Sequence, residues 1–352
     1  MDDQLPLIFD GHNDVLLKMF CAGEAESVKS FAGGREGAID LPKSRMGGFG
    51  GGFFAIYVPS APGDIDRFDE MNKPKYDLPL SEPVGFSQAK QIAQSQAAIL
   101  IRLQEMGALE ICTTSKQIAD CFERGVIAAL MHMEGAEAID EDLHALDLFY
   151  QAGMRSIGPV WSRTNSFGYG VPFRFPSDCD TGPGLTEKGI KLVRRCNELN
   201  IMLDLSHINE AGFWDVAKHS NAPLVATHSN VHQLCASSRN LTNKQLAAIA
   251  ESDGMVGVNF AVAFLRSDGQ KNVDTSLDLI LSHLNHPIEF VGEDRVGFGS
   301  DYDGADVPRE ISTAADLPRL RSAMRSHGYD DALMDKLCHK NWLRVLEKTW
   351  GA

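Results

Sequence analysis

Three histidines and three carboxylates stand at the ends of apolar runs along this chain. The stretch IFDGHNDVL places His12 and Asp14 one residue apart, directly after such a run. Side chains at positions i and i+2 of a strand point to the same side, so these two can contact the same bound group. The other members of the set end later apolar runs, and they are Glu134, His207, His228 and Asp301.

Taken alone, each of these residues is more often structural than functional. A histidine at a strand end commonly makes only structural hydrogen bonds, and a lone aspartate there commonly caps a helix. Their convergence changes this balance, because buried carboxylates and imidazoles would leave unpaired charge unless a cation lay among them. Nitrogen and oxygen ligands without a thiolate suit Zn²⁺, for which Mn²⁺, Co²⁺ or Fe²⁺ can substitute.

Six ligands exceed what one tetrahedral ion with an open position needs, so we expect two Zn²⁺ ions per chain. Two neighbouring ions need a bridging carboxylate, and Glu134 is the natural candidate because it stands alone on its strand between the two halves of the set. The hypothesis therefore shares Glu134 and assigns the remaining ligands to one ion as His12, Asp14 and Asp301 and to the other as His207 and His228.

Repeated β-α units are expected to position these side chains. Apolar runs, each followed by a stretch of helical period, predict strands at residues 5–14, 51–58, 126–135, 154–161, 201–207, 223–229, 254–260 and 295–304. They predict an α/β fold of the (β/α)8 TIM-barrel type, whose active sites lie at the C-terminal ends of the strands. Insertions at about 59–86 and 165–184 are expected to be lids or specificity loops of a single catalytic domain spanning residues 1–352.

Composition narrows the class of partner. The 352 residues include 48 acidic and 33 basic side chains, and the net charge of −15 argues against a nucleic acid or an anionic membrane. No secretory start and no run near ~20 apolar residues is visible, so we expect a cytoplasmic protein that does not bind a membrane. Seven scattered cysteines without a C-x-x-C pair are typical of reduced thiols, which leaves metal binding to histidine and carboxylate.

Six ordered motifs resemble those of the membrane (renal) dipeptidase family of zinc peptidases. They are FDGHND, HMEGAEAI, LDLSH, ATHSN, SSRNLT and GFGSDYDG, and the likeness extends to the ending KNWLRVLEKTW. Within this family the chain looks like a soluble microbial-type member. The resemblance implies an amidohydrolase-type barrel with two zinc ions bridged by a glutamate. It also implies a homodimer and hydrolysis of free dipeptides, including L-Xaa-D-Xaa such as L-Ala-D-Ala. The family's metal ligands fall on the same six residues, and its carboxylate-binding arginine falls on Arg239.

One motif departs from the family. Where relatives often carry a histidine that contacts the substrate carbonyl, this chain reads GPVWSRTNSFGYG, and Trp161 or Ser162 takes its place. Trp161 would then narrow the pocket and alter side-chain preference, although a buried aromatic at the barrel rim is the alternative. The missing donor is left to Arg163, Asn165 or the second metal ion.

The expected mechanism assigns a role to each of these parts. A metal-bridging hydroxide is the nucleophile, because coordination lowers the pKa of water from ~15.7 to roughly 7. Asp301 and Glu134 are the expected catalytic residues, with Asp301 passing a proton to the leaving amine. Arg239 offers a bidentate fork for the substrate carboxylate, and Asp303 is one candidate for the amine.

Two other functions are weighed against a dipeptidase. One is another binuclear amidohydrolase, acting as an N-acyl-amino-acid acylase or a lactonase. Many such enzymes bridge their metals with a lysine, whereas the fourth strand here ends VWSR. The other is a non-catalytic barrel that binds a small molecule, which would be expected to have lost at least one ligand.

Overall fold

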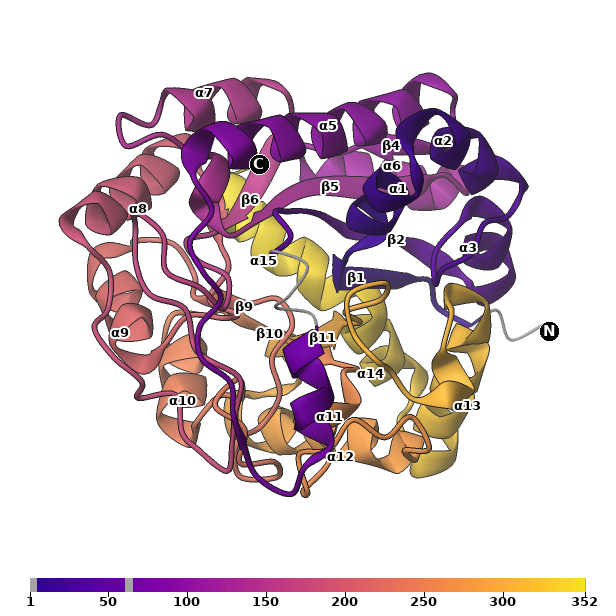
Figure 1. Cartoon of the computed structure of the whole chain (residues 1–352). Coiled ribbons are helices and arrows are strands. Elements are labelled where there is room, and N and C mark those ends of the chain that lie inside the picture. Colours follow the sequence, from indigo (N-terminus) through magenta and orange to yellow (C-terminus); the bar gives the residue numbers. More distant parts are fainter. Residues whose placement is uncertain (1–4, 61–65, 352) are drawn as a thin grey trace.

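The computed structural model describes residues 5–60 and 66–351. Its barrel strands are β1 (Ile8–Asn13), β2 (Phe49–Tyr57), β5 (Ile127–Glu134), β6 (Met154–Gly158), β8 (Met202–Leu203), β9 (Val225–Ala226), β10 (Met255–Asn259) and β11 (Val296–Gly299). They are parallel and follow one another around the barrel in the order β8, β6, β5, β2, β1, β11, β10, β9. This near-closed barrel, ringed by helices in Figure 1, confirms the predicted TIM-barrel class.

Helices connect the strands and cover the outside of the barrel (Figure 1). Several begin at the hydroxyl caps that the sequence suggests: Thr114 and Thr242 each form a reciprocal capping box with a glutamine three residues later. The helices are α1 (Val15–Ala22), α2 (Glu24–Gly33), α3 (Leu41–Gly47), α5 (Phe86–Glu105), α6 (Ser115–Arg124), α7 (His144–Gln151), α8 (Glu187–Leu199), α9 (Glu210–His219), α10 (Asn243–Glu251), α11 (Val262–Leu265), α12 (Leu277–Val291), α13 (Leu317–His327), α14 (Asp331–Asp335) and α15 (Asn341–Trp350).

The interior of the barrel is filled by side chains, so it is not a pore. Phe9 and Phe53 point inward from β1 and β2 and pack with the fully buried Trp342 of α15. The Trp342 indole N–H donates to the Phe298 carbonyl at 3.0 Å, so its one polar group is satisfied inside an apolar cluster. This packing fixes the frame on which the strand ends are held.

Seven of the eight barrel strands are shorter than predicted, and β8, β9 and β11 each stop at least two residues before the candidate ligand that follows. The predicted strand 201–207 ends at Leu203, and the predicted strand 295–304 ends at Gly299. His207 and Asp301 themselves have φ of 63° and 60°, in the left-handed region, so neither residue can belong to a regular strand. A short strand that the sequence did not predict, β4 (Leu109–Ile111), pairs with β5.

The two insertions meet each other. From the first comes β3 (Tyr76–Asp77) and from the second β7 (Arg174–Phe175), and they pair antiparallel in a sheet separate from the barrel. In Figure 1 the purple segment before α5 runs in front of the barrel strands, and its residues 61–65 lie outside the described part of the chain. Among the described helices, none is both long and apolar enough to cross a bilayer.

Candidate functional site

The structure brings the six expected metal ligands together at the ends of the strands. The ligand atoms within each of two groups lie within 4.8 Å of one another, and the groups are His12, Asp14 and Asp301, and Glu134, His207 and His228. These are the two sets that the sequence hypothesis assigns to separate ions. All six side chains are buried or nearly so, with 9% the largest exposed fraction.

Glu134, the last residue of β5, joins the two groups. Its Oε1 lies 3.2 Å from His207 Nε2, 3.4 Å from His228 Nε2 and 3.6 Å from His12 Nε2. One carboxylate oxygen thus faces imidazoles of both groups, which is the position that a bridging ligand requires.

Ligand atoms of His12 and Asp14 lack hydrogen-bond partners among the described residues, which tests whether a cation fits. Neither ring nitrogen of His12 nor Oδ1 of Asp14 has a hydrogen-bond partner among the described residues. Asp14 stands at the N-cap of α1, yet its side chain makes no capping bond to the described backbone. Buried nitrogen and oxygen lone pairs without donors are costly unless a cation meets them, so the donor set fits a metal.

Hydroxyl groups orient two of the histidines. Ser162 Oγ lies 2.8 Å from His207 Nδ1, and Thr227 Oγ1 lies 2.8 Å from His228 Nδ1. Both contacts use the ring nitrogen that points away from Glu134, so Nε2 of each ring is left facing the ligand cluster. Such outer partners fix the tautomer of a metal-binding imidazole.

Asp204 is a buried carboxylate that the sequence analysis missed. It forms a further close group with His12 and His228, but its Oδ1 already accepts from the backbone N–H groups of Ser206 and Thr227, each at 2.9 Å. Its Oδ2 accepts from the Thr227 hydroxyl at 2.7 Å. These bonds join the ends of β8 and β9, and the signal in the sequence was the aspartate in LDLSH.

The buried ionisable groups of the site perturb one another's pKa values. Burial raises the pKa of Glu134 well above its usual range, and the Asp14 and Asp301 carboxylates add to this. Burial alone would lower the pKa of His12, but the attraction of Glu134 and Asp14 outweighs it and raises that pKa to about 10. Burial lowers the pKa of His207 well below its usual range, which keeps this ring neutral as a ligand must be.

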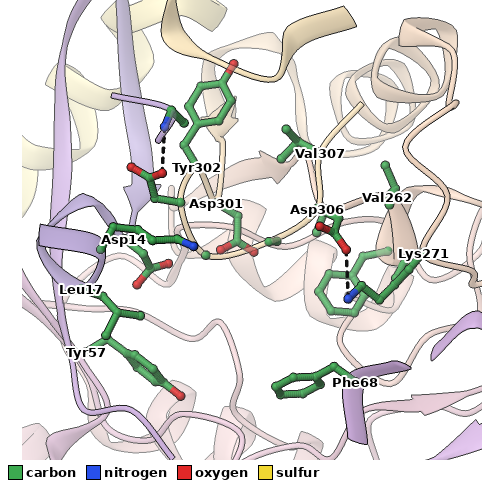
Figure 2. A pocket seen from close by; sticks show the side chains of 18 of the residues that line it. Asp14, Leu17, Tyr57, Phe68, Val262, Lys271, Asp301, Tyr302, Asp306 and Val307 are labelled. Carbon is green, nitrogen blue, oxygen red and sulfur yellow. Dashed lines mark hydrogen bonds and ion pairs between the residues drawn. The ribbon is translucent and has the colours of Figure 1, made fainter. Parts of the chain in front are cut away.

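A cavity of about 830 Å³ opens onto this cluster and is lined by Asp14, Glu134, His207 and Asp301. Figure 2 shows Asp14 and Asp301 on one side of it, with Tyr57 and Phe68 across the space. A concave site with apolar walls and a few polar groups at one end is the usual form of a small-molecule pocket.

At the position where the sequence departs from the family, the two neighbours play different parts. Trp161 lines the cavity, with its ring centroid 5.1 Å from that of Tyr57, whereas Ser162 turns to His207. The expected replacement donors are engaged elsewhere: Arg163 forms an ion pair with Glu137 and donates to the Val58 carbonyl, and Asn165 donates to the Pro159 carbonyl. These contacts do not favour Arg163 or Asn165 as the replacement for the missing histidine, and that role stays a prediction.

Arg239 lies behind His228 with 3% of its surface exposed. Its guanidinium donates to the His228 carbonyl at 3.2 Å and to Ser229 Oγ at 3.4 Å, and Nε has no partner among the described residues. Burial lowers its pKa to about 10, so the side chain stays cationic at neutral pH. Asp303 lines the cavity, and its carboxylate accepts from Arg35 and from the Ala38 N–H, so its pairing with the substrate amine stays a prediction.

Known proteins resemble this chain over nearly its whole length. The model of the membrane dipeptidase family, peptidase family M19, matches residues 3–350. A crystal structure of a metallopeptidase from Rhodobacter sphaeroides, liganded with a phosphinate mimic of the dipeptide L-Ala-D-Ala, is 50% identical with a TM-score of 0.96, covering 99% of this chain and 100% of that one.

Two curated relatives are described by their gene neighbourhoods. An uncharacterized protein in the pqqA 5′ region of Klebsiella pneumoniae is 49% identical over 74% of this chain and 96% of its own length. An uncharacterized protein in the PQQ-III 3′ region of Acinetobacter calcoaceticus is 43% identical over 81% of this chain and 90% of its own length.

Proposed function

Because the chain belongs to the membrane dipeptidase family, peptidase family M19, we propose that it is a zinc-dependent dipeptidase that hydrolyses free dipeptides, including L-Ala-D-Ala. The observation that carries the proposal is the pair of buried ligand groups that Glu134 joins at the mouth of the cavity. The 50% identical metallopeptidase adds support, since its ligand mimics this dipeptide with a tetrahedral phosphorus where hydrolysis forms a tetrahedral carbon.

The chain offers ligands for two Zn²⁺ ions. One would be held by His12, Asp14 and Asp301 and the other by His207 and His228, with Glu134 shared. When bound, such ions lower the pKa of a coordinated water and polarise the scissile carbonyl. Mn²⁺, Co²⁺ or Fe²⁺ would suit the same nitrogen and oxygen donors.

Asp301 is the proposed proton shuttle of the reaction. Its Oδ2 accepts from Asn259 Nδ2 at 2.8 Å, which fixes the side chain at the cavity wall. Burial raises the pKa of this carboxyl, and a raised pKa suits a group that takes a proton from the attacking water and gives it to the leaving nitrogen.

Arg239 is proposed to hold the substrate's C-terminal carboxylate. It is a cation near neutral pH whose Nε is unpartnered among the described residues, and a planar guanidinium suits a carboxylate. Capture of that end would restrict the enzyme to peptides that finish one residue beyond the scissile bond.

Steady-state hydrolysis of L-Ala-D-Ala, L-Ala-L-Ala and N-acetyl-D-Ala would test the proposal, using zinc-loaded protein and a chelated control. We expect zinc-dependent cleavage of the free dipeptides and no reaction with the acetylated compound. Cleavage of N-acetyl-D-Ala alone would move the chain to the acylases. The homodimer and the cytoplasmic location stay predictions, which size-exclusion chromatography and cell fractionation would test.

A further inference from the structure

The cavity is larger than a small dipeptide needs. Its volume of about 830 Å³ lies within the ~300–1,000 Å³ of pockets that enclose drug-sized molecules. Two alanine methyl groups would leave most of its apolar surface exposed to water. The surplus space therefore raises the question of which side chain fills it.

A continuous set of aromatic rings forms one side of this space. We call it the aromatic wall, and it consists of Trp161, Phe173, Phe68 and Phe264, all of which line the cavity. The Phe173 ring is its centre, with centroids 5.8 Å from Trp161, 5.4 Å from Phe68 and 6.0 Å from Phe264. Phe68 and Phe173 come from the two insertions and remain partly exposed, so their rings offer surface to a ligand.

The wall stands directly against the metal ligands. Trp161 and Phe173 have ring centroids 5.6 Å and 6.1 Å from that of His207. Across the cavity from Phe68 lie the carboxylates of Asp301 and Asp306, the latter paired with Lys271 at 2.9 Å (Figure 2). A substrate at the metal cluster thus meets charge on one side and aromatic surface on the other.

The position of Arg239 orients the substrate along the wall. Its guanidinium carbon lies 5.4 Å from the centre of the Phe264 ring, which itself stacks on Phe173. If Arg239 holds the carboxylate, the C-terminal residue of the dipeptide is the one nearest these two rings. Its side chain, attached one carbon from that carboxylate, would lie on the Phe173 face.

We propose that the aromatic wall is a specificity site that selects dipeptides with a large apolar, preferably aromatic, C-terminal side chain, and that Phe173 is its main determinant. This rests on the proposed dipeptidase function. An aromatic pair is stabilised beyond the burial of its area, so a phenyl group on the wall gains more than a methyl group. The partly exposed rings also lose contact with water when they are covered.

The test compares kcat/KM for L-Ala-D-Ala, L-Ala-D-Phe and L-Phe-D-Ala in the wild-type holoenzyme. We expect L-Ala-D-Phe to exceed L-Ala-D-Ala by about tenfold or more, within the range that one hydrophobic subsite provides. Equal or lower values for L-Ala-D-Phe would overturn the proposal, and a preference for L-Phe-D-Ala alone would overturn its C-terminal assignment. Failure to hydrolyse any of the three would instead contradict the dipeptidase function.

The variant Phe173→Ala is expected to reduce the ratio of kcat/KM for L-Ala-D-Phe over L-Ala-D-Ala by about tenfold. Phe173→Leu, which keeps an apolar side chain, should retain a larger share of the ratio and guards against a folding defect. Phe290→Ala, which removes a 45% exposed phenylalanine from α12, is the matched control and should leave the ratio unchanged. A wild-type ratio in both Phe173 variants, with metal content intact, would refute the role of this residue.

Discussion

Replacing Asp204 with asparagine should weaken metal binding, because Asp204 acts through the Thr227 hydroxyl on the tautomer of His228. The Asp204 carboxylate only accepts hydrogen bonds, so the Thr227 hydroxyl must donate to it and accept from His228 Nδ1–H. His228 Nε2 then carries a lone pair for the metal. The amide of the Asp204→Asn variant would present an N–H to the Thr227 oxygen, turn the hydroxyl toward Nδ1, and favour the ring with its proton on Nε2.

The magnitude follows from what the isosteric substitution keeps and loses. The asparagine oxygen can still accept from the backbone N–H groups of Ser206 and Thr227, now held at 2.9 Å, so the fold should persist. The cost falls on the tautomer of His228, and disturbing such an outer partner typically reduces metal affinity about 10–100-fold. This corresponds to about 1.4–2.7 kcal/mol of binding free energy.

Chelator competition on the apo-protein would measure the zinc affinity of Asp204→Asn, with circular dichroism as the check of folding. Turnover at saturating metal should change much less than affinity. Asp215→Asn is the matched control. Asp215 also accepts a hydrogen bond from a backbone N–H, that of Leu185 at 2.8 Å, but this bond does not lead to a candidate ligand. Wild-type zinc affinity in a folded Asp204→Asn protein would refute the tautomer argument.

Three further predictions concern the ligands and the buried histidines. Asp301→Asn should keep much of its metal by elemental analysis yet lose about 10²–10⁴-fold in kcat, and full activity in the metal-replete variant would contradict a proton shuttle. Glu134→Ala should bind fewer than two metal ions per chain, and a stoichiometry of two would exclude it as the bridge. Burial lowers the pKa of His283 from 6.5 to about 4, where its Nδ1 accepts from the Val231 N–H. The folded state therefore binds fewer protons at His283 than the unfolded state does. This contribution to the free energy of unfolding is full above about pH 6.5, and up to about 3 kcal/mol of it is lost as the pH falls from about 6.5 to about 4. Urea unfolding at both pH values should show a smaller loss of unfolding free energy for His283→Gln than for the wild type. An equal loss in the two proteins would show that His283 is not its cause.

The barrel was predictable because its strands are short apolar runs that end in polar residues. The run before His12 and the run before Glu134 both became strands with buried residues throughout. The sequence does not reveal where a ladder stops when tertiary geometry imposes it. His207 and Asp301 read as strand ends, but their left-handed backbone places them beyond β8 and β11.

The convergence of the six candidate ligands was predictable, because residue type alone indicates their chemistry. A role that depends on distant partners was not predictable. Asp204 gains its role from the Thr227 hydroxyl just beyond β9, and Phe173 gains its place from the pairing of two insertions that are far apart in the sequence. The orientation of the Arg163 side chain likewise depends on its ion pair with Glu137, a buried partner that no local pattern indicates.

The left-handed backbone at His207 and Asp301 implies a trade-off between stability and function in the evolution of this chain. A residue with a Cβ costs about 1–2 kcal/mol in this conformation, and glycine avoids most of it. Selection for thermal stability alone would therefore favour glycine at both positions and remove two candidate ligands in the process. A laboratory population screened only for heat resistance should accumulate such changes, whereas one that must also cleave peptides should keep the strained residues.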